Sequence, residues 1–259
     1  MGAINLDALR KKLTQLNSES NKTTSLWKPT NGETVIRVVP YKHVPDNPFI
    51  EMQFHYDIGG KTYLSPLSFG RPDPIEEFAI KLRANGDKDS YQMARKLEAK
   101  TRTFLPVVVR GEEAQGVKFW GFGKLVNTEL MEFFLDEDYG DISDPLNGRD
   151  ITVKFIPKEE TGANFPKTTI RVKPNQTPLT ENKAQLDALL NNQKDIREVY
   201  QELTYDDLKD ALVQYLNPTD EEEDTEVTDT PSPQQAEVTS QSATAADFDD
   251  LFNKAKATA

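Results

Sequence analysis

The chain has 259 residues, and hydrophobic residues make up 36% of them, a low fraction that indicates a folded core together with a segment that does not pack. It contains no cysteine, which excludes a disulfide framework and a thiolate metal site. No apolar run reaches the length of about eighteen residues that a membrane span needs, and the N-terminus lacks the pattern of a secretion signal. We therefore expect a soluble intracellular protein.

The formal net charge of −12 argues at first against a partner as acidic as nucleic acid. The charge is unevenly distributed, because residues 217–259 hold eleven acidic residues against two lysines, a net of −9. The preceding 216 residues therefore carry only −3, the difference between −12 and −9. Such a nearly neutral core can gather its cations on one face.

Residues 1–20 are expected to form a basic arm ahead of the core. Leucines recur at helical spacing at Leu6, Leu9, Leu13 and Leu16. The arm also carries the basic and hydroxyl cluster Arg10, Lys11, Lys12 and Thr14. This cluster is either a solvated helical face or a contact surface.

Short β-branched and alternating runs predict strands from residue 34 onwards. Residues 34–40 follow a turn signal, and residues 50–56 are joined to residues 61–64 through Gly59-Gly60, the chemistry of a hairpin. Pro74 is expected to open a helix, and a second helix begins near Ser90. The two helices would form an insert over about residues 70–100.

The second half of the core continues this mixture. Strands are predicted at residues 101–109, 117–123, 151–156 and 168–172, with a helix before an acidic loop at 136–144. Two amphipathic helices are expected within residues 180–216. The pattern predicts an α+β, mainly β class: an OB-fold-like, partly open barrel with a helical insert and C-terminal helices. The expected organisation is arm 1–20, core 21–216 and acidic tail 217–259.

The tail beyond Pro218 has the composition of a disordered segment, because it cannot bury enough apolar surface to order itself. Apolar residues return near its end among carboxylates, which favours a docking motif over a purely solubilising tail. The motif consists of Asp247, Phe248, Asp249, Asp250, Leu251 and Phe252.

Sequence-tolerant binding of single strands needs cations along the phosphates and aromatic faces for the bases. Residues 81–124 combine both, and Arg37 is expected to face outward or into a groove. The candidate cations are Arg37, Lys81, Arg95, Lys96, Lys100, Arg102, Arg110 and Lys118. The candidate stacking residues are Phe104, Trp120, Phe122 and, in a turn, Phe165. Aromatic residues on strands are more often core, but Gly121 leaves one face of its strand bare, which would admit a ligand or a bulge.

Catalytic motifs are sparse. The sequence has no P-loop, HExxH or GxSxG motif, and His43 and His55 lack metal-ligand spacing. We therefore expect no catalytic site, no metal and no cofactor. The acidic loop 136–144 breaks the EF-hand spacing, so a metal-dependent nuclease is a weak alternative function. A scaffold protein that never binds nucleic acid is the other.

Motifs spread over most of the chain point to one known family. They are Trp27-Lys28-Pro29, residues 35–40, Pro48-Phe49, residues 60–63, Arg102-Thr103-Phe104 and residues 119–124. In this order they resemble the single-stranded DNA-binding (helix-destabilising) proteins of T-even-type phages. The resemblance implies cooperative, sequence-independent coating of single-stranded DNA in phage replication, recombination and repair. It implies self-association through the arm, recruitment of replication and recombination proteins by the tail, and a place in the cytoplasm of the infected host cell.

One segment departs from that family, whose best-known members hold zinc with one histidine and three cysteines. Asp73-Pro74-Ile75-Glu76 stands where a Cys-Pro-x-Cys would fall, so no closed four-ligand zinc site can be built. We expect the helices at 75–100 to be held by apolar packing instead.

Overall fold

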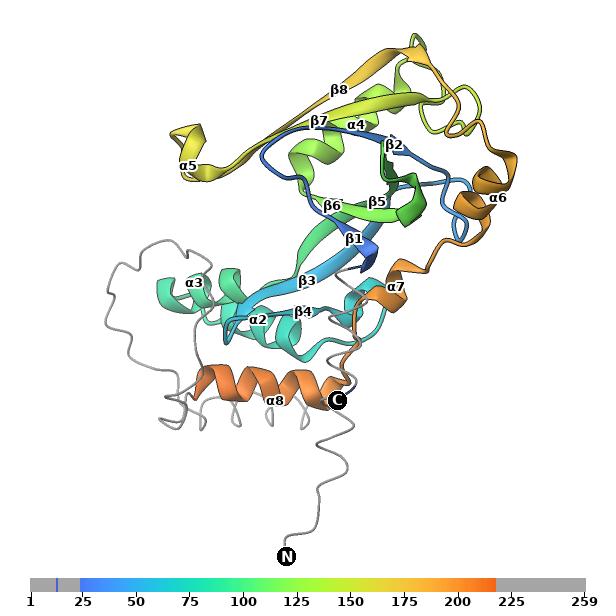
Figure 1. Ribbon diagram of the computed structural model, residues 1–259. Helices are drawn as coiled ribbons and strands as arrows, with labels where there is room; N and C mark the ends of the chain where they lie inside the picture. The colour runs from blue at the N-terminus through green and yellow to red at the C-terminus, as the bar shows by residue number, and fades with distance from the viewer. Residues whose placement is uncertain (1–12, 14–23, 218–259) are drawn as a thin grey trace, which may run out of the picture. The chain divides into compact units, whose positions relative to one another are not determined.

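The computed structural model describes Leu13 and residues 24–217, drawn in colour in Figure 1. The described chain forms two compact units. Unit 1 contains residues 24–52 and 101–201, and unit 2 contains residues 53–100 and 202–217. The strand β3 (Ile50–Ile58) passes from the first unit into the second.

The strands belong to an open, eight-stranded sheet, which together with the helices gives the mixed α+β class and OB-like architecture that the sequence predicts. Its main path has the order β1-β6-β5-β2-β7-β8. These strands are β1 (Leu26–Trp27), β2 (Gly32–Val38), β5 (Lys100–Val109), β6 (Lys118–Phe122), β7 (Arg149–Ile156) and β8 (Lys167–Gln176). The β1–β6 pair is parallel and its neighbours along the path are antiparallel.

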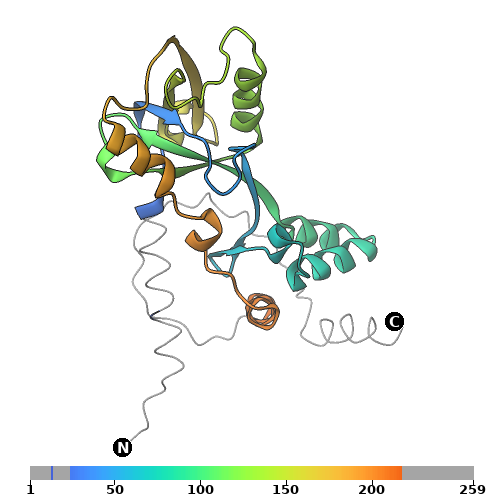
Figure 2. The same ribbon diagram turned by 90° about the vertical axis from the view of Figure 1, so that its right-hand side faces the viewer.

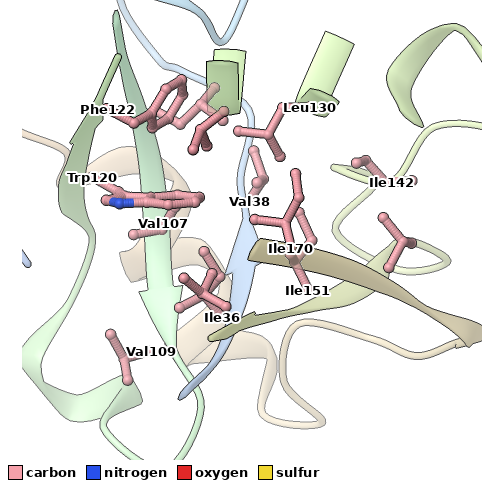
Figure 3. Close-up of a cluster of buried hydrophobic side chains, with 14 residues drawn as sticks. Ile36, Val38, Val107, Val109, Trp120, Phe122, Leu130, Ile142, Ile151 and Ile170 are labelled. Carbon is pink, nitrogen blue, oxygen red and sulfur yellow. The ribbon is translucent and has the colours of Figure 1, made fainter. Parts of the chain in front are cut away.

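Alternate residues of these strands build the core of unit 1. Ile36, Val107, Trp120 and Ile151 come from four strands and are all buried in it (Figure 3). The helix α4 (Lys124–Leu135) adds Val126 and Leu130. Because side chains alternate across a strand, the residues between them point to the opposite face of the sheet.

Helices cover part of that opposite face. Val39 and Val108 pack with Leu179 and with Leu189 of α6 (Lys183–Asn191). Tyr41 is also buried here, and its hydroxyl group donates to Asp195 at 3.1 Å, at the start of α7 (Ile196–Val199). Burial is the main cause that raises the pKa of Tyr41 to about 12.

Unit 2 is a hairpin with three helices. Gly59 and Gly60, both at positive φ, join β3 to β4 (Lys61–Leu64). A short 3₁₀ helix, η1 (Pro66–Phe69), leads to α2 (Pro74–Ala84) and α3 (Lys88–Leu97), and α8 (Tyr205–Leu216) completes the unit (Figure 2). The buried apolar residues are Ile58, Ile75, Phe78, Ala79, Leu82, Ala94, Leu97, Leu208 and Leu212. The apolar packing predicted for the helical insert is therefore present.

The predicted strands, the hairpin of residues 50–64 and the helices at 74–100 are confirmed, and the strands predicted at 151–156 and 168–172 pair with each other. One prediction about the helices is wrong. Residues 180–216 contain three helices rather than two, because Asp195 and Thr204 each cap a new helix after α6. Two short helices also lie in predicted turns, η2 (Glu113–Gln115) and α5 (Lys158–Thr161).

Candidate nucleic-acid interface

The aromatic strand β6 and its neighbour β5 lie inside unit 1, which corrects three of the predicted stacking residues. Phe104, Trp120 and Phe122 are only 2%, 1% and 4% exposed. Trp120 makes an edge-on contact with Phe122 at a ring-centroid distance of 4.8 Å (Figure 3). It makes another with Trp27 at 5.6 Å. These rings have no face left for a base, so they are core residues.

The bare face expected at Gly121 is filled by the protein itself. A Cβ atom at this position would lie 2.6 Å from Cε1 of Phe104, so glycine is what lets that ring cross the strand. The other side of the Phe104 ring meets Tyr200, at a centroid distance of 5.8 Å. Arg102 stays exposed at the same place, and its guanidinium donates to the carbonyl oxygen of Gly121 at 2.7 Å.

Arg37 does not face outward as predicted, because its guanidinium is held in a buried hydrogen-bond network. Its side chain is fully buried and donates to the Asp150 carboxylate at 3.1 Å and to both oxygens of Thr177. Burial lowers the pKa of Arg37, an effect that the charge of Asp150 opposes and that of Arg110 reinforces. Arg110 donates to the same carboxylate at 2.8 Å and to the carbonyl oxygen of Pro178 at 3.0 Å.

Lys118 is a third candidate cation that is engaged within the protein. Only 17% of its side chain is exposed, and its Nζ donates to Oε1 of Gln115 at 2.6 Å. Arg37, Arg110 and Lys118 therefore hold the sheet and its loops, which corrects their assignment as phosphate contacts.

The remaining cationic candidates of unit 2 lie on α2 and α3, except Lys100, which is the first residue of β5. Arg95, Lys96 and Lys100 are exposed, and Lys81 is half-buried. Lys100 donates from Nζ to the carbonyl oxygen of Arg95 at 3.1 Å and lies 3.7 Å from the Glu98 carboxylate. These helices therefore present an exposed cationic surface, as predicted.

Tyr91 is a candidate that the sequence did not single out. Its side chain is 50% exposed on α3, and the Arg83 guanidinium lies over its ring at 5.6 Å. Arg83 also pairs with Glu98. The signal was a lone tyrosine among the polar residues of the first turn of α3. It adds an aromatic face to the α2–α3 cations.

A second cationic surface lies on the long hairpin of β7 and β8 in unit 1 (Figure 1). The register pairs Lys154 with Thr169, Ile156 with Lys167, and Thr152 with Arg171. Lys154, Lys167 and Arg171 thus share one face and are exposed, while Val153 and Ile170 point into the core on the other. We call these three cations the hairpin basic face. Glu33, which pairs with Lys154 from β2, is an exposed acid beside it.

Phe165 lies in the connection of this hairpin and is 76% exposed. It follows α5 and precedes Lys167, and its backbone carbonyl accepts from the Thr161 hydroxyl at 3.1 Å. An exposed ring held next to cations is suited to base stacking. The sequence identified Phe165 but missed Lys154 and Arg171, although the alternating pattern of both strands places their side chains on one face.

A buried polar cluster in unit 2 contains Asp73, His55 and Ser65. His55 Nε2 lies 2.8 Å from Oδ2 of Asp73, which also accepts from the Ser65 hydroxyl, and Oδ1 of Asp73 caps α2. Burial opposes ionisation of Asp73, but the hydrogen bonds from His55 and Ser65 and the charge of His55 together lower its pKa.

These side chains do not fit a zinc ion. Both ring nitrogens of His55 are engaged, since Nδ1 lies against the carbonyl oxygen of Leu97, and the Glu76 carboxylate accepts from the Ala99 amide at 2.9 Å. Among the described residues no group of His, Asp and Glu side chains is placed to hold a metal ion. The serine donates to the aspartate and not to the histidine, so the three also lack the order of a catalytic triad.

In the acidic loop 136–144, the alternative nuclease site, three carboxylates accept hydrogen bonds from the loop's own turns. Asp136 accepts from the amide of Asp138, Asp141 from Ser143, and Asp144 from the amides of Leu146 and Asn147. This is the pattern of side chains that stabilise turns.

Two predicted sites lie outside the described residues. They are the arm residues Arg10, Lys11, Lys12 and Thr14, and the docking motif Asp247 to Phe252. Their roles stay predictions.

A family model described as "gp32 DNA binding protein like" matches residues 30–215, which is most of the chain. The search of curated proteins finds no match. None of the described helices is long and apolar enough to cross a membrane.

Proposed function

Because the chain belongs to the family of gp32-like DNA-binding proteins, we propose that it coats single-stranded DNA during phage replication, recombination and repair. The family match over residues 30–215 carries this proposal. The exposed cations and rings of the two units support it, because they are the groups that follow phosphates and stack on bases without reading sequence. The family binds DNA and is not a family of enzymes.

The proposed binding mode divides the work between two kinds of side chain. Lys154, Lys167 and Arg171 contact phosphates, and the α2–α3 cations add to them. Phe165 and Tyr91 stack on bases. Since no part of this scheme reads base edges, binding is expected to tolerate any sequence.

The ends of the chain supply the remaining roles in the proposal. The basic arm 1–20 contacts a neighbouring copy and makes coating cooperative. The acidic tail competes with DNA for the cationic surfaces and presents Phe248, Leu251 and Phe252 to replication and recombination proteins. The place of action is the cytoplasm of the infected host cell.

A salt titration with fluorescently labelled oligonucleotides tests the proposal. We expect tight anisotropy binding to a single strand, weaker binding to the matching duplex, and a linear fall of log affinity with log salt concentration. Removing residues 217–259 should tighten binding most at low salt, where repulsion between tail and DNA is least screened. Equal affinity for single strand and duplex, or no binding, would contradict the proposal.

A further inference from the structure

The outer side of α4 carries large apolar side chains that no part of the described chain covers. Leu125 is 88% exposed and Leu135 is 82% exposed, and the partly exposed Met131 lies between them. The opposite side of the helix already packs on the core through Val126 and Leu130. Two largely exposed leucines on one helix form an apolar surface of the kind that a partner buries with a gain in free energy.

Acidic side chains continue this surface. Glu132, Asp136, Glu137 and Asp138 are exposed on the last turns of α4 and in the loop that follows, and none of them forms an ion pair within the described residues. Arg149 donates to the backbone carbonyl of Tyr139 at 2.9 Å, and Lys124 is an exposed cation at the first residue of α4. The leucines and these carboxylates together are called the α4 outer face.

The arm has the complementary pattern. Its leucines Leu9, Leu13 and Leu16 recur at helical spacing, and at that spacing Arg10 and Lys12 fall on either side of the leucine stripe. An apolar stripe flanked by cations matches an apolar surface that has one carboxylate between its leucines and others at the end of the helix, because each supplies what the other must bury or neutralise.

We propose that the α4 outer face is the docking site for residues 1–20 of a neighbouring copy of this chain. The inference rests on the proposed cooperative coating, since an arm docked on its own molecule would not connect neighbouring copies on the DNA. The leucines of the arm cover Leu125 and Leu135, and Arg10 and Lys12 approach Glu132 and Glu137. Each bound copy thereby offers its own α4 outer face to the next arm.

Charge reversal in the full-length chain tests this site. R10E/K12E and E132K/E137K should each weaken binding to long single strands by about tenfold, because like charges now meet at the contact. Affinity for an oligonucleotide that holds one copy should change by no more than about twofold, since neither pair contacts DNA. The two variants mixed in equal amounts should regain the affinity for long strands, because reversed arms then meet reversed faces between copies.

A second pair of variants tests the apolar half of the contact. L125S/L135S should reduce long-strand affinity about tenfold, whereas Leu146→Ser, an exposed leucine outside α4, should leave it unchanged.

In the charge-reversal experiment, no rescue in the mixture, or rescue only when both reversals stand in one chain, would overturn docking between copies. If the unmodified chain binds long and short strands alike, cooperative coating itself fails. If R10E/K12E abolishes cooperativity and the α4 variants do not, only the docking site is wrong.

Discussion

The strand pairs β5–β6 and β7–β8 differ in how many of their faces are covered. The β5–β6 pair is richer in aromatic residues, yet Phe104, Phe119, Trp120 and Phe122 are all buried. The β7–β8 pair turns most of its apolar residues to one face and leaves Lys154, Lys167 and Arg171 exposed on the other, where Ile156 is the apolar neighbour of Lys167. A dense aromatic strand thus marks the core here, and a hairpin covered on one face leaves the exposed cations that the proposed function assigns to DNA.

The largest effect expected from this comparison is on stability. Trp120→Ala should cost about 3–5 kcal/mol of unfolding free energy, because it removes a large side chain from the packed core. Denaturant unfolding measures the loss. At a temperature where the variant is still folded, its affinity for a short single strand should equal that of the unmodified chain. A selective loss of DNA affinity with unchanged stability would reverse the assignment of the ring.

Removal of the hairpin basic face should weaken DNA binding and leave the stability of the fold nearly unchanged. Each phosphate contact with a single strand contributes about 0.7 to the salt slope, so K154Q/K167Q/R171Q should lower the slope by about 2. At 0.1 M salt this corresponds to roughly a hundredfold weaker binding. Unfolding free energy should change by less than about 0.5 kcal/mol per substitution, because the side chains are exposed.

A matched control uses Lys28, Lys61 and Lys183, which are exposed outside the hairpin and outside α2 and α3. Their replacement by glutamine removes the same charge, and we expect a smaller change of salt slope. Equal slopes for both triple variants would show that total charge, and not the hairpin, sets the affinity.

Phe165→Ala tests the exposed ring of the same hairpin. It should weaken binding by about 1–3 kcal/mol, the range measured for one stacked base, and leave the unfolding free energy unchanged. Phe165→Tyr keeps the aromatic face and should retain the affinity in the same anisotropy assay. A similar loss in both variants would point to loop shape in place of stacking.

The last prediction concerns how stability depends on pH through the buried Asp73 carboxylate of unit 2. Asp73 has a lowered pKa in the folded state, so its ionised form stabilises the fold above the pKa of the unfolded chain. This stabilisation should disappear as the pH falls through the lowered value, below the ordinary carboxylic-acid range near about pH 4. Thermal unfolding against pH should show this loss in the unmodified chain, and a flatter acid limb in Asp73→Asn.

Local chemistry explains why much of the fold was predictable. Gly59-Gly60 fixes a hairpin, Pro74 after Asp73 starts a helix, and alternation places Ile36 and Val38 in a core. The partition into two units was not predictable, because residues 202–217 return to pack beside residues 53–100 over a long separation in sequence. The third C-terminal helix was missed because its cap, Asp195, lies inside a polar stretch without periodicity.

The candidate site was less predictable for the same reason. Burial of Arg37 depends on Asp150 and Thr177, which lie 113 and 140 residues away in sequence. The space beside Gly121 is filled by the Phe104 ring from the neighbouring strand, which the sequence of its own strand does not reveal. Phe165 was identified correctly as exposed, since a connection rich in polar residues is seldom packed.

The Asp150 carboxylate affects how many counterions are released when this protein binds DNA. It pairs with both Arg37 and Arg110 inside the folded chain, so these guanidinium groups are engaged before DNA arrives and are expected to add little to counterion release. A census of arginines and lysines in the sequence therefore overstates the number of ions released on binding. Only the unfolded chain would present all of its cations to a polyanion.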